Sequence, residues 1–357
     1  MRTFLISILI FMASALGTSA QTYFDFKVPF PAAPLVKNDT VSLLIVGDVM
    51  MHARQLEYDY TEFLEEMKPL LNKADFTIAN MEFSLGGKPY SGYPAFSAPD
   101  GYANYVKECG VDVFLMANNH ILDRSIKGLK RTLSVYDSLG IRFCGAARDS
   151  LSMEESFPLI LRKDGLSIAL LNFTYGTNAP ASRGYPAVCM MDKDKIHHAI
   201  AKAKEKKADV IIALPHWGTE YQLTHSSEQA KWAGWLVEEG VDAIVGAHPH
   251  VVQDTTHISG VPIIYSTGNF ISNMSARNTR LGMAVELRII RKDGRAVLQE
   301  PVLHFTWCTL PGMLSKTYKT IPIKKWASRK DDWLTKSDYE NMLATLKRVC
   351  ESTSINY

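Results

Sequence analysis

Two histidines separated by a single proline suggest metal chemistry. His248 and His250 lie in the stretch GAHPH, at the end of the apolar run 241–247. Two imidazoles two residues apart can point into one site from a turn, and imidazole is a common metal ligand. A histidine-rich turn without a ligand is the alternative. The pair predicts a metal site only if other segments bring further ligands to the same place.

Polar side chains follow other apolar runs in the same way. Asp48 alone could be a turn or helix-cap residue, and His216 alone could be a buried structural histidine. The repetition of the pattern is stronger evidence than any one member. Besides the histidine pair, the set consists of Asp48, His52, Asn80, Glu82, Asn118, Asn119, His120, Asp123, His216, Glu220 and Asn269.

The chemistry that suits these groups is metal-assisted displacement. Carboxylate, amide and imidazole groups are ligands for one or two divalent ions of the Mn, Zn, Fe or Mg kind. Two such ions can share a bridging carboxylate, activate a water and hold a phosphoryl oxygen. His120, carrying no metal, would protonate a leaving group or stabilise the transition state.

The strands and helices that must position these groups are predicted from the pattern of apolar residues along the chain. Apolar, β-branched runs predict buried strands, and segments with apolar residues three and four apart predict helices. Since ligands bind outside the carboxyl ends of strands in α/β sheets, the polar groups should meet at one edge. The predicted strands are 41–47, 74–80, 111–118, 140–146, 167–173, 208–214, 241–247 and 261–267, and the predicted helices are 55–71, 125–140, 193–207 and 227–240.

Two further segments predict antiparallel pairs. The stretches 157–173 and 281–305 each place an Asp-Gly turn, Asp164-Gly165 and Asp293-Gly294, between two apolar runs. The sheets are therefore expected to be mixed. The remaining histidines are interpreted as structural, with His225 the first exception to consider because it follows the HWGTEY loop; the others are His197, His198, His257 and His304.

The N-terminus predicts export. Arg2 precedes a short apolar stretch, and Thr18-Ser19-Ala20 ends it with small residues, which is typical of a signal peptide (1–20) cleaved near Ala20. We therefore expect a periplasmic or extracellular protein. An uncleaved membrane anchor is the alternative. A Pro-rich lead-in segment occupies 21–40.

Composition excludes some classes of protein. The 357 residues carry a formal net charge of +2 with acids and bases interspersed, so no nucleic-acid footprint is present. The five cysteines are odd in number and irregular in spacing, and their pairing cannot be read from the sequence.

Six motifs in order resemble the CapA family of poly-γ-glutamate capsule-synthesis proteins, which is related to the calcineurin-like metallophosphoesterases. They are GD (47–48), NME (80–82), NNHILD (118–123), HWGTEY (216–221), GAHPH (246–250) and YSTGNF (265–270). The resemblance implies a four-layer α/β/β/α sandwich of metallophosphatase type over residues 41–310, with 311–357 as a C-terminal extension packed on it.

The resemblance also implies roles for individual residues. Metal ligands are expected at Asp48, Glu82, Asn119, His216, His248 and His250, with His52 as a further candidate. His120 would be catalytic with Asp123 orienting it, and substrate would meet Asn80, Glu220, Tyr265, Ser266 and Asn269. Two departures stand out: His52 follows Asp48 at a longer spacing than in the phosphoesterases, and Glu82 stands where they carry an aspartate.

Three functions remain open at this point. The leading hypothesis is a secreted metal-dependent hydrolase, phosphoesterase-like, linked to capsule or poly-γ-glutamate synthesis or to envelope polymer processing. The second is a non-enzymatic accessory protein that binds an anionic polymer for export or anchoring, with a membrane capsule synthase or exporter as partner. The third is a structural domain, which predicts no bound metal.

Overall fold

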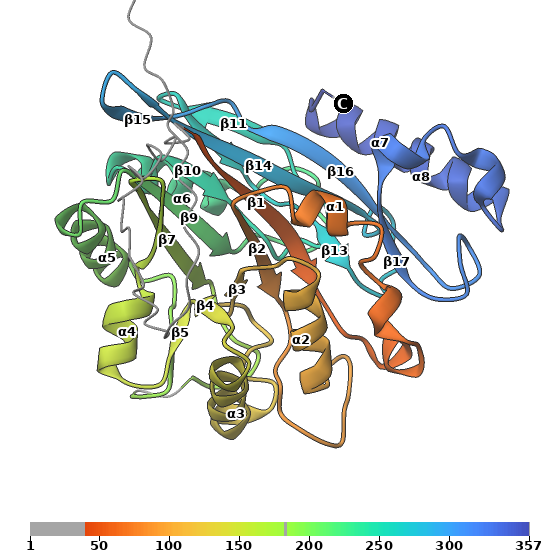
Figure 1. Cartoon of the computed structure of the whole chain (residues 1–357), viewed down its shortest axis with the longest axis horizontal. Helices are drawn as coiled ribbons and strands as arrows, with labels where there is room; N and C mark the ends of the chain where they lie inside the picture. Colours follow the sequence, from red (N-terminus) through yellow and green to blue (C-terminus); the bar gives the residue numbers. More distant parts are fainter. Residues whose placement is uncertain (1–39, 182–183, 357) are drawn as a thin grey trace, which may run out of the picture. The chain divides into compact units, whose positions relative to one another are not determined.

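The computed structural model describes residues 40–181 and 184–356 of the chain (Figure 1). The expected signal peptide, residues 1–20, and the lead-in segment, 21–40, lie outside the described residues except for Thr40. Export therefore stays a prediction. Among the described residues, no helix combines the length and the apolar content needed to span a membrane.

Two mixed β-sheets form the centre of the fold. The first runs in the order β17 (Lys319–Pro322), β16 (Val302–Thr309), β14 (Leu281–Lys292), β1 (Thr40–Val49), β2 (Phe76–Met81), β3 (Val113–Leu115) and β4 (Arg142–Cys144), with β13 (Asn269–Ile271) on β1 and β15 (Arg295–Leu298) on β14. The second runs β11 (Thr255–Ile258), β12 (Val261–Ile264), β10 (Ala243–Val245), β9 (Val210–His216), β7 (Leu166–Thr174) and β6 (Leu159–Lys163). A small ribbon pairs β5 (Ala146–Ala147) with β8 (Ala187–Val188).

Side chains that alternate between the two faces of each strand build the layers of the fold. Leu43 and Ile45 of β1 belong to one buried apolar cluster with Ile168 and Ile212 of the second sheet, so these side chains fill the space between the sheets. Leu44, one residue on, belongs to the cluster that packs under the helices. Successive strand side chains point to opposite faces, so a strand buried on both faces reads as a continuous apolar run.

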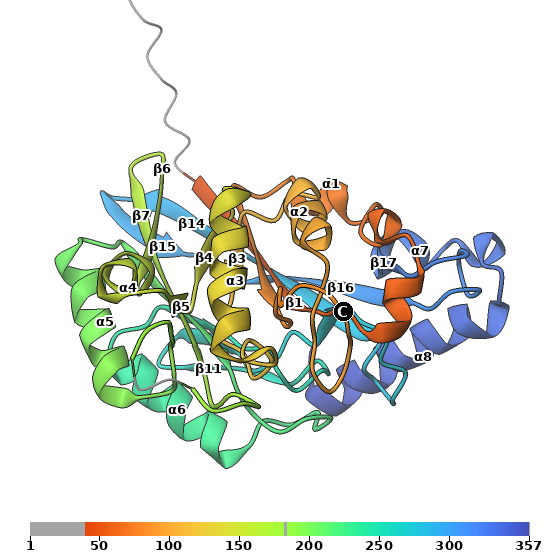
Figure 2. The same ribbon diagram turned by 90° about the horizontal axis from the view of Figure 1, so that it is seen from below.

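Helices cover the outer faces of both sheets. The first sheet carries α2 (Asp100–Glu108) and α3 (Ser125–Ser138), and the second carries α5 (Lys193–Glu205) and α6 (Ser227–Glu238), as Figures 1 and 2 show. Ser226 caps α6, because its hydroxyl accepts the Gln229 N–H and the Gln229 side chain accepts the Ser226 N–H. The four-layer α/β/β/α sandwich with mixed sheets is thereby confirmed.

The predicted helix over 55–71 is wrong. The segment instead forms two 3₁₀ turns, Ala53–Glu57 and Tyr60–Glu62, and one short helix, α1 (Lys68–Leu71). The Asp59 carboxylate accepts the Thr61 N–H, which starts a new turn and interrupts the old one. Local side-chain capping therefore overrides the apolar spacing.

Both predicted hairpins are confirmed. β6 and β7 pair antiparallel from Lys163 and Leu166 outward, and β14 and β15 pair from Lys292 and Arg295. In each turn the Asp and the Gly have positive φ, 51° and 78° in the first and 51° and 77° in the second. Asp-Gly favours this backbone because glycine carries no Cβ and aspartate tolerates it.

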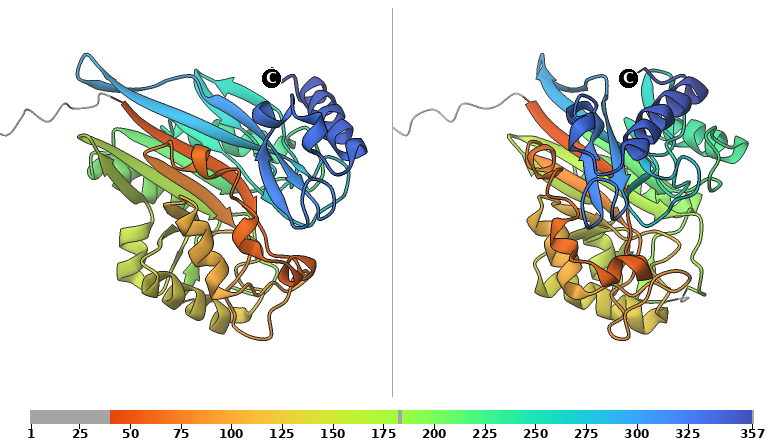
Figure 3. Two further views of the ribbon diagram at one scale, coloured as in Figure 1. Left: turned by 45° about the vertical axis from the view of Figure 1, so that its right-hand side comes forward. Right: turned by 90° about the vertical axis from the view of Figure 1, so that its right-hand side faces the viewer.

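The C-terminal part extends the sandwich. β17 pairs antiparallel with β16, and α7 (Ile323–Trp326) and α8 (Lys336–Thr353) lie beside the first sheet (Figure 3). Arg280, the residue before β14, makes two hydrogen bonds to Asp338 of α8, of 2.5 and 2.7 Å. The remaining helix, α4 (Ser150–Ser156), lies between β5 and β6. The five cysteines are all free and buried.

Candidate metal centre

Neighbouring strands carry the first ligands to one edge. Asp48 of β1 lies in register with Asn80 of β2 on one side and Asn269 of β13 on the other. Asn80 Nδ2 donates to Asp48 Oδ1 at 2.7 Å. Gly47 is required here, because a Cβ at this position would lie 1.9 Å from the Gly268 carbonyl oxygen. Close backbone packing therefore delivers the Asp48 carboxylate to the edge.

The histidine pair sits on a strained turn. His248 and His250 both have positive φ, 102° and 58°, in a region that residues with a Cβ rarely occupy. The Tyr221 N–H donates to Pro249 O at 2.9 Å, and this hydrogen bond holds the turn in place. Backbone strain of this kind gathers at functional sites, where surrounding structure maintains it.

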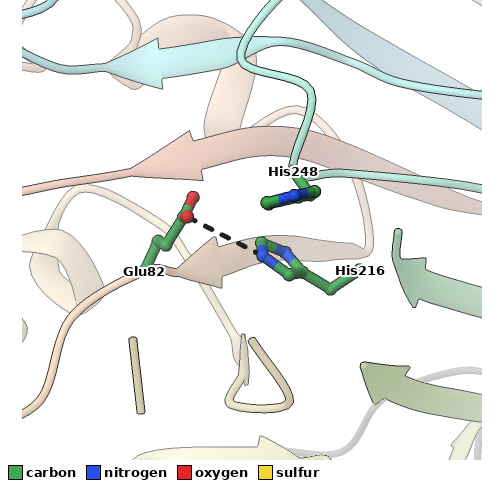
Figure 4. Close-up of side chains that lie close together, drawn as sticks. All are labelled: Glu82, His216 and His248. Carbon is green, nitrogen blue, oxygen red and sulfur yellow. Dashed lines mark ion pairs between the residues drawn. The ribbon is translucent and has the colours of Figure 1, made fainter. Parts of the chain in front are cut away.

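Three overlapping groups of side chains could each hold a cation. Within each group one donor atom per residue lies within 4.8 Å of the others. Figure 4 shows the first, in which the His216 and His248 rings and the Glu82 carboxylate converge. His216 Nε2 lies 3.7 Å from Glu82 Oε1. The groups are Glu82, His216 and His248; Asp48, Glu82 and His250; and Glu220, His248 and His250.

Buried polar atoms without partners test whether these residues suit a metal. Both carboxylate oxygens of Glu82 and His248 Nδ1 are buried and have no hydrogen-bond partner, and the buried Asp48 Oδ2 has His250 Nδ1 3.2 Å away. Leaving such atoms unsatisfied is costly, most of all when they are charged. Their residues belong to the overlapping cation groups, which fits one or two divalent cations with nitrogen and oxygen ligands.

Electrostatics separates the histidines into two kinds. Burial lowers the pKa of His248 to about 3 and that of His216 well below its ordinary value. Both imidazoles are therefore neutral near pH 7, which is the form that binds metal.

His250 behaves in the opposite way. Burial opposes its charge, but Glu82 and a hydrogen bond to Asp48 outweigh that effect and raise its pKa to about 10. Burial beside Asp48 likewise raises the pKa of Glu82 well above its usual value. Two carboxylates buried together require a proton or a cation between them. Without metal the His250 proton meets that requirement, and a divalent ion would replace it.

Asparagines hold the histidine rings from outside. Asn119 Oδ1 lies 2.9 Å from His216 Nε2, and Asn269 Oδ1 lies 3.0 Å from His250 Nδ1. Asn119 Oδ1 thus stands beside the same imidazole nitrogen that approaches Glu82. The geometry brings Asn119 to the cluster with the other expected ligands.

His120 and Asp123 form a separate pair beside the cluster. His120 Nδ1 lies 2.7 Å from Asp123 Oδ2, and that oxygen also accepts the Phe96 N–H at 2.8 Å. The carboxylate therefore selects the tautomer with hydrogen on Nδ1 and leaves Nε2 for proton exchange. Phe96 also packs its ring edge-on at 4.7 Å from the imidazole, which limits ring rotation.

Three expected residues lie apart from the cluster. The Tyr265 ring stacks on His225 at 4.0 Å, and the Ser266 hydroxyl donates to Val251 O. Both side chains therefore contact residues that support the site. His52 joins none of the three cation groups formed by the described residues. Its Nε2 is buried without a partner, and burial together with His250 and His120 lowers its pKa to about 4.

Sequence reasoning assigned no role to Asn118 and missed Tyr175 and Asn178. Asn178 places its amide nitrogen 3.2 Å from His120 Nδ1, and Asn118 Oδ1 accepts the His120 N–H at 3.1 Å. Tyr175 lies against His248 with ring centroids 4.7 Å apart. Asn118 could be singled out because it is a polar residue at the end of a predicted strand. Tyr175 and Asn178 lie in a loop that contains none of the six motifs.

The remaining histidines lie away from the metal cluster. His197 pairs with Glu239, His257 with Glu300 and His304 with Glu286. His225 pairs with Asp254 at 2.7 Å. Each of these four histidines contacts a carboxylate that belongs to none of the cation groups, as expected for structural histidines.

Comparison with known proteins assigns the family. A family model described as bacterial capsule synthesis protein PGA_cap matches residues 42–274. The chain belongs to this family. The PGA_cap match covers all six motifs, and the resemblance to CapA proteins is confirmed.

Two curated relatives extend the similarity beyond the motifs. The capsule biosynthesis protein CapA of Bacillus anthracis is 29% identical over 277 residues, which cover 73% of this chain and 67% of the relative. The PGA biosynthesis protein CapA of Bacillus subtilis (strain 168) is 28% identical over 280 residues, 75% of this chain and 72% of the relative. PGA_cap membership links the chain to capsule and poly-γ-glutamate synthesis.

Among solved structures, the fold is similar to that of a Staphylococcus aureus protein named "Putative 5'-Nucleotidase", solved in complex with alpha-ketoglutarate. The TM-score is 0.51 at 12% identity, covering 74% of this chain and 54% of the other. At this identity the likeness concerns the fold alone, and the fold is of metallophosphatase type.

Proposed function

We propose that this protein is an exported, metal-dependent hydrolase of phosphoesterase type that acts in the synthesis or processing of a capsule polymer. The observation that carries the proposal is a pair of cation groups that share Glu82, whose two carboxylate oxygens are buried without a hydrogen-bond partner, beside the His120–Asp123 pair. A purely structural domain has no use for buried ligand atoms without partners.

The described residues suit one or two divalent ions. Asp48, Glu82, His216, His248 and His250 offer the donor atoms, with Asn119 beside them. Such ions supply Lewis acidity and lower the pKa of water when bound. Glu220 shares a cation group with His248 and His250, so it can hold a metal as well as meet substrate.

His120 is the proposed general acid. Asp123 fixes its orientation and tautomer, and Nε2 can deliver a proton to the leaving oxygen or nitrogen of the substrate. Because the pair is more than nine-tenths buried, with side-chain exposures of 5% and 1%, bulk water does not compete freely for this proton.

Family membership directs the proposal toward the cell envelope. The substrate is an anionic envelope polymer or a phosphoester formed during its assembly, and a membrane synthase or exporter is the expected partner. The signal peptide expected at 1–20, with cleavage near Ala20, would place the mature protein outside the cytoplasm.

The test is hydrolysis by metal-free protein reconstituted separately with Mn²⁺, Zn²⁺, Fe²⁺ and Mg²⁺. Chromogenic phosphomonoesters and phosphodiesters, simple amides and γ-glutamyl amides serve as substrates. We expect turnover with at least one ion, reversed by chelation and lost in Glu82→Gln. Glu300→Gln is the matched control, because Glu300 is an exposed carboxylate that pairs with His257.

A metal-loaded protein that hydrolyses none of these substrates would contradict the proposal. Metal-dependent binding of an anionic polymer without turnover would then favour an accessory protein.

A further inference from the structure

A hollow opens between the loops that follow β7 and β9 and the start of α6. Its volume is about 320 Å³, near the lower end of the range for ligand pockets. A hollow of this size takes one small unit of a ligand and not a folded partner. Aromatic and polar side chains dominate its lining, which includes Tyr175, Trp217, Thr219, Ser227, Glu228 and Trp232.

One aromatic ring joins the hollow to the candidate metal centre. The Tyr175 ring lines the hollow and also lies against His248, with ring centroids 4.7 Å apart. The Tyr175 N–H donates to His216 O at 3.0 Å, so the main chain holds this ring beside two of the expected metal ligands. The ring is 49% exposed, which leaves part of it free for a ligand. A unit bound in the hollow therefore lies one ring away from the metal cluster.

A second aromatic ring is held in place from outside the hollow. Trp232 packs edge-on against Trp235 with ring centroids 5.4 Å apart, and Lys193 Nζ lies 5.7 Å from the Trp232 centroid. Trp235 and Lys193 do not line the hollow themselves. Edge-to-face and cation–π contacts both stabilise a ring in one orientation. The Trp232 ring is therefore a preformed surface in the wall.

The wall between the two rings is closely packed. Gly218 has a φ of 94°, and a Cβ at this position would lie 2.7 Å from the Gln229 amide. The Gln229 side chain accepts the Ser226 N–H and donates to Gln253 Oε1, so both ends of its amide are used within the fold. The hollow is therefore shaped by the fold before any ligand enters.

Three polar side chains of the lining are available to a ligand. Within the described part of the chain, Thr219, Ser227 and Glu228 make no side-chain hydrogen bond or ion pair. Among the described residues that line the hollow, Glu228 is the one carboxylate, and none is a lysine, arginine or histidine. The lining therefore offers two hydroxyls and one strong acceptor to a ligand.

We propose that the hollow binds a neutral sugar unit of a ligand whose reacting group lies at the metals. The clause about the metals rests on the proposed function, whereas the sugar site itself needs no metal. One face of a pyranose ring presents C–H bonds, which pack on the negative face of an aromatic ring such as Trp232 or Tyr175. The pyranose hydroxyls donate to the Glu228 carboxylate and exchange hydrogen bonds with the hydroxyls of the lining.

The charges at the hollow disfavour ionised ligands. An acidic unit brings a second negative charge beside Glu228, and no cation of the lining compensates for it. A cationic unit packed on Trp232 shares that ring with the Lys193 ammonium, which repels it. A neutral unit with several hydroxyls meets neither penalty.

The experiment measures binding of methyl β-glycosides to the purified protein by ligand-observed NMR. The probes are the glucoside and the galactoside, each compared with its uronide, which differs at C6 alone. We expect at least one neutral glycoside to bind, and its uronide to bind at least about threefold more weakly at low salt. Glu228→Gln should remove most of the difference between the two, because it removes the repelling charge.

Variants of the two rings assign the binding to the hollow. Trp232→Ala and Tyr175→Ala should each weaken binding of the neutral glycoside about three- to tenfold. Trp232→Phe and Tyr175→Phe each retain a ring and should recover most of the affinity. Tyr90→Ala is the control and should bind as wild type does, because Tyr90 is an exposed ring that lies against Lys88 and not in the hollow.

The proposal is overturned if neither neutral glycoside binds at about 50 mM, or if both alanine variants bind as wild type does. Tighter binding of a uronide, of methyl glucosaminide or of adenosine also overturns it, because the hollow would then select an acid, a cation or an aromatic base. Loss of sugar binding after chelation would place the sugar at the metals instead. Sugar binding without hydrolysis of any ester counts against the proposed function alone, and hydrolysis without sugar binding counts against this inference alone.

Discussion

Two histidine–aspartate pairs in this protein have the same hydrogen-bond distance but different surroundings. In both, Nδ1 lies 2.7 Å from a carboxylate Oδ2, in His120–Asp123 and in His225–Asp254. The side chains of the first pair are 5% and 1% exposed, and those of the second are 28% and 21% exposed. The hydrogen bond alone therefore does not distinguish an acid–base pair from a structural one.

The neighbours make the difference. His120 lies beside the cation cluster and makes edge-on contacts with the Phe96 and Tyr93 rings. His225 stacks flat on Tyr265 at 4.0 Å, and its own N–H also donates to Asp254. We propose that the first pair positions a proton, whereas the second ties a loop to β11.

The largest expected effect separates the two histidines. His120→Ala should lower kcat for the best ester by about 10²–10⁴-fold at unchanged metal content, because the proton donor is removed. His225→Ala should change kcat less than about threefold. Steady-state kinetics with elemental analysis measures both. Equal losses in the two variants would show that location does not decide the role.

The next effect concerns the carboxylates. Asp123→Asn should lower kcat by on the order of ten- to a hundredfold, because the ring remains but its tautomer and orientation are no longer fixed. The pH profile of kcat should shift as well. Asp254→Asn is the matched control and should leave the profile in place. An unshifted profile in Asp123→Asn would argue that Asp123 only supports the fold.

A third prediction, on the pH dependence of stability, distinguishes His250 from the two histidine–aspartate pairs. Its pKa rises from 6.5 to about 10 in the folded, metal-free protein, so its stabilising proton is fully present below pH 6.5 and lost toward pH 10. Metal-free protein should melt at lower temperature at pH 9.5 than at pH 7, and metal should remove this difference. His250→Ala should lose the effect and His225→Ala should keep it. Thermal melts at both pH values measure it.

The smallest expected effect is on stability. His225→Ala breaks the ion pair with Asp254 and the stack on Tyr265, and both are partly exposed. We expect a loss of about 1 kcal/mol in unfolding free energy, measured by urea denaturation. A loss of bound metal in this variant would contradict the structural role.

The strand ends could be predicted from sequence, and the loops could not. Asp48, Glu82, His216 and the GAHPH pair each follow a buried apolar run, and parallel strands bring such positions to one edge. That logic found the cluster and, with the six motifs, the sandwich. It carries no information about a loop that folds back from a distance.

The misses have physical causes. Tyr175 and Asn178 reach the site through the hydrogen bonds from Tyr175 N to His216 O and from Asn178 N to Asn119 O, which no periodicity encodes. The capping of Thr61 by Asp59 broke the expected helix over 55–71. Tyr265 and Ser266 sit in a family motif, yet their side chains support the turn behind the histidines.

The central claim is that the buried Asp48, Glu82 and histidine atoms bind a divalent metal. Elemental analysis of protein purified without added metal, then of metal-free protein reloaded with Mn²⁺, Zn²⁺, Fe²⁺ or Mg²⁺, tests it directly. We predict at least about one ion per chain after reloading. That ion should be lost in Glu82→Gln and retained in His120→Ala. A metal content near zero after every reloading would contradict the account.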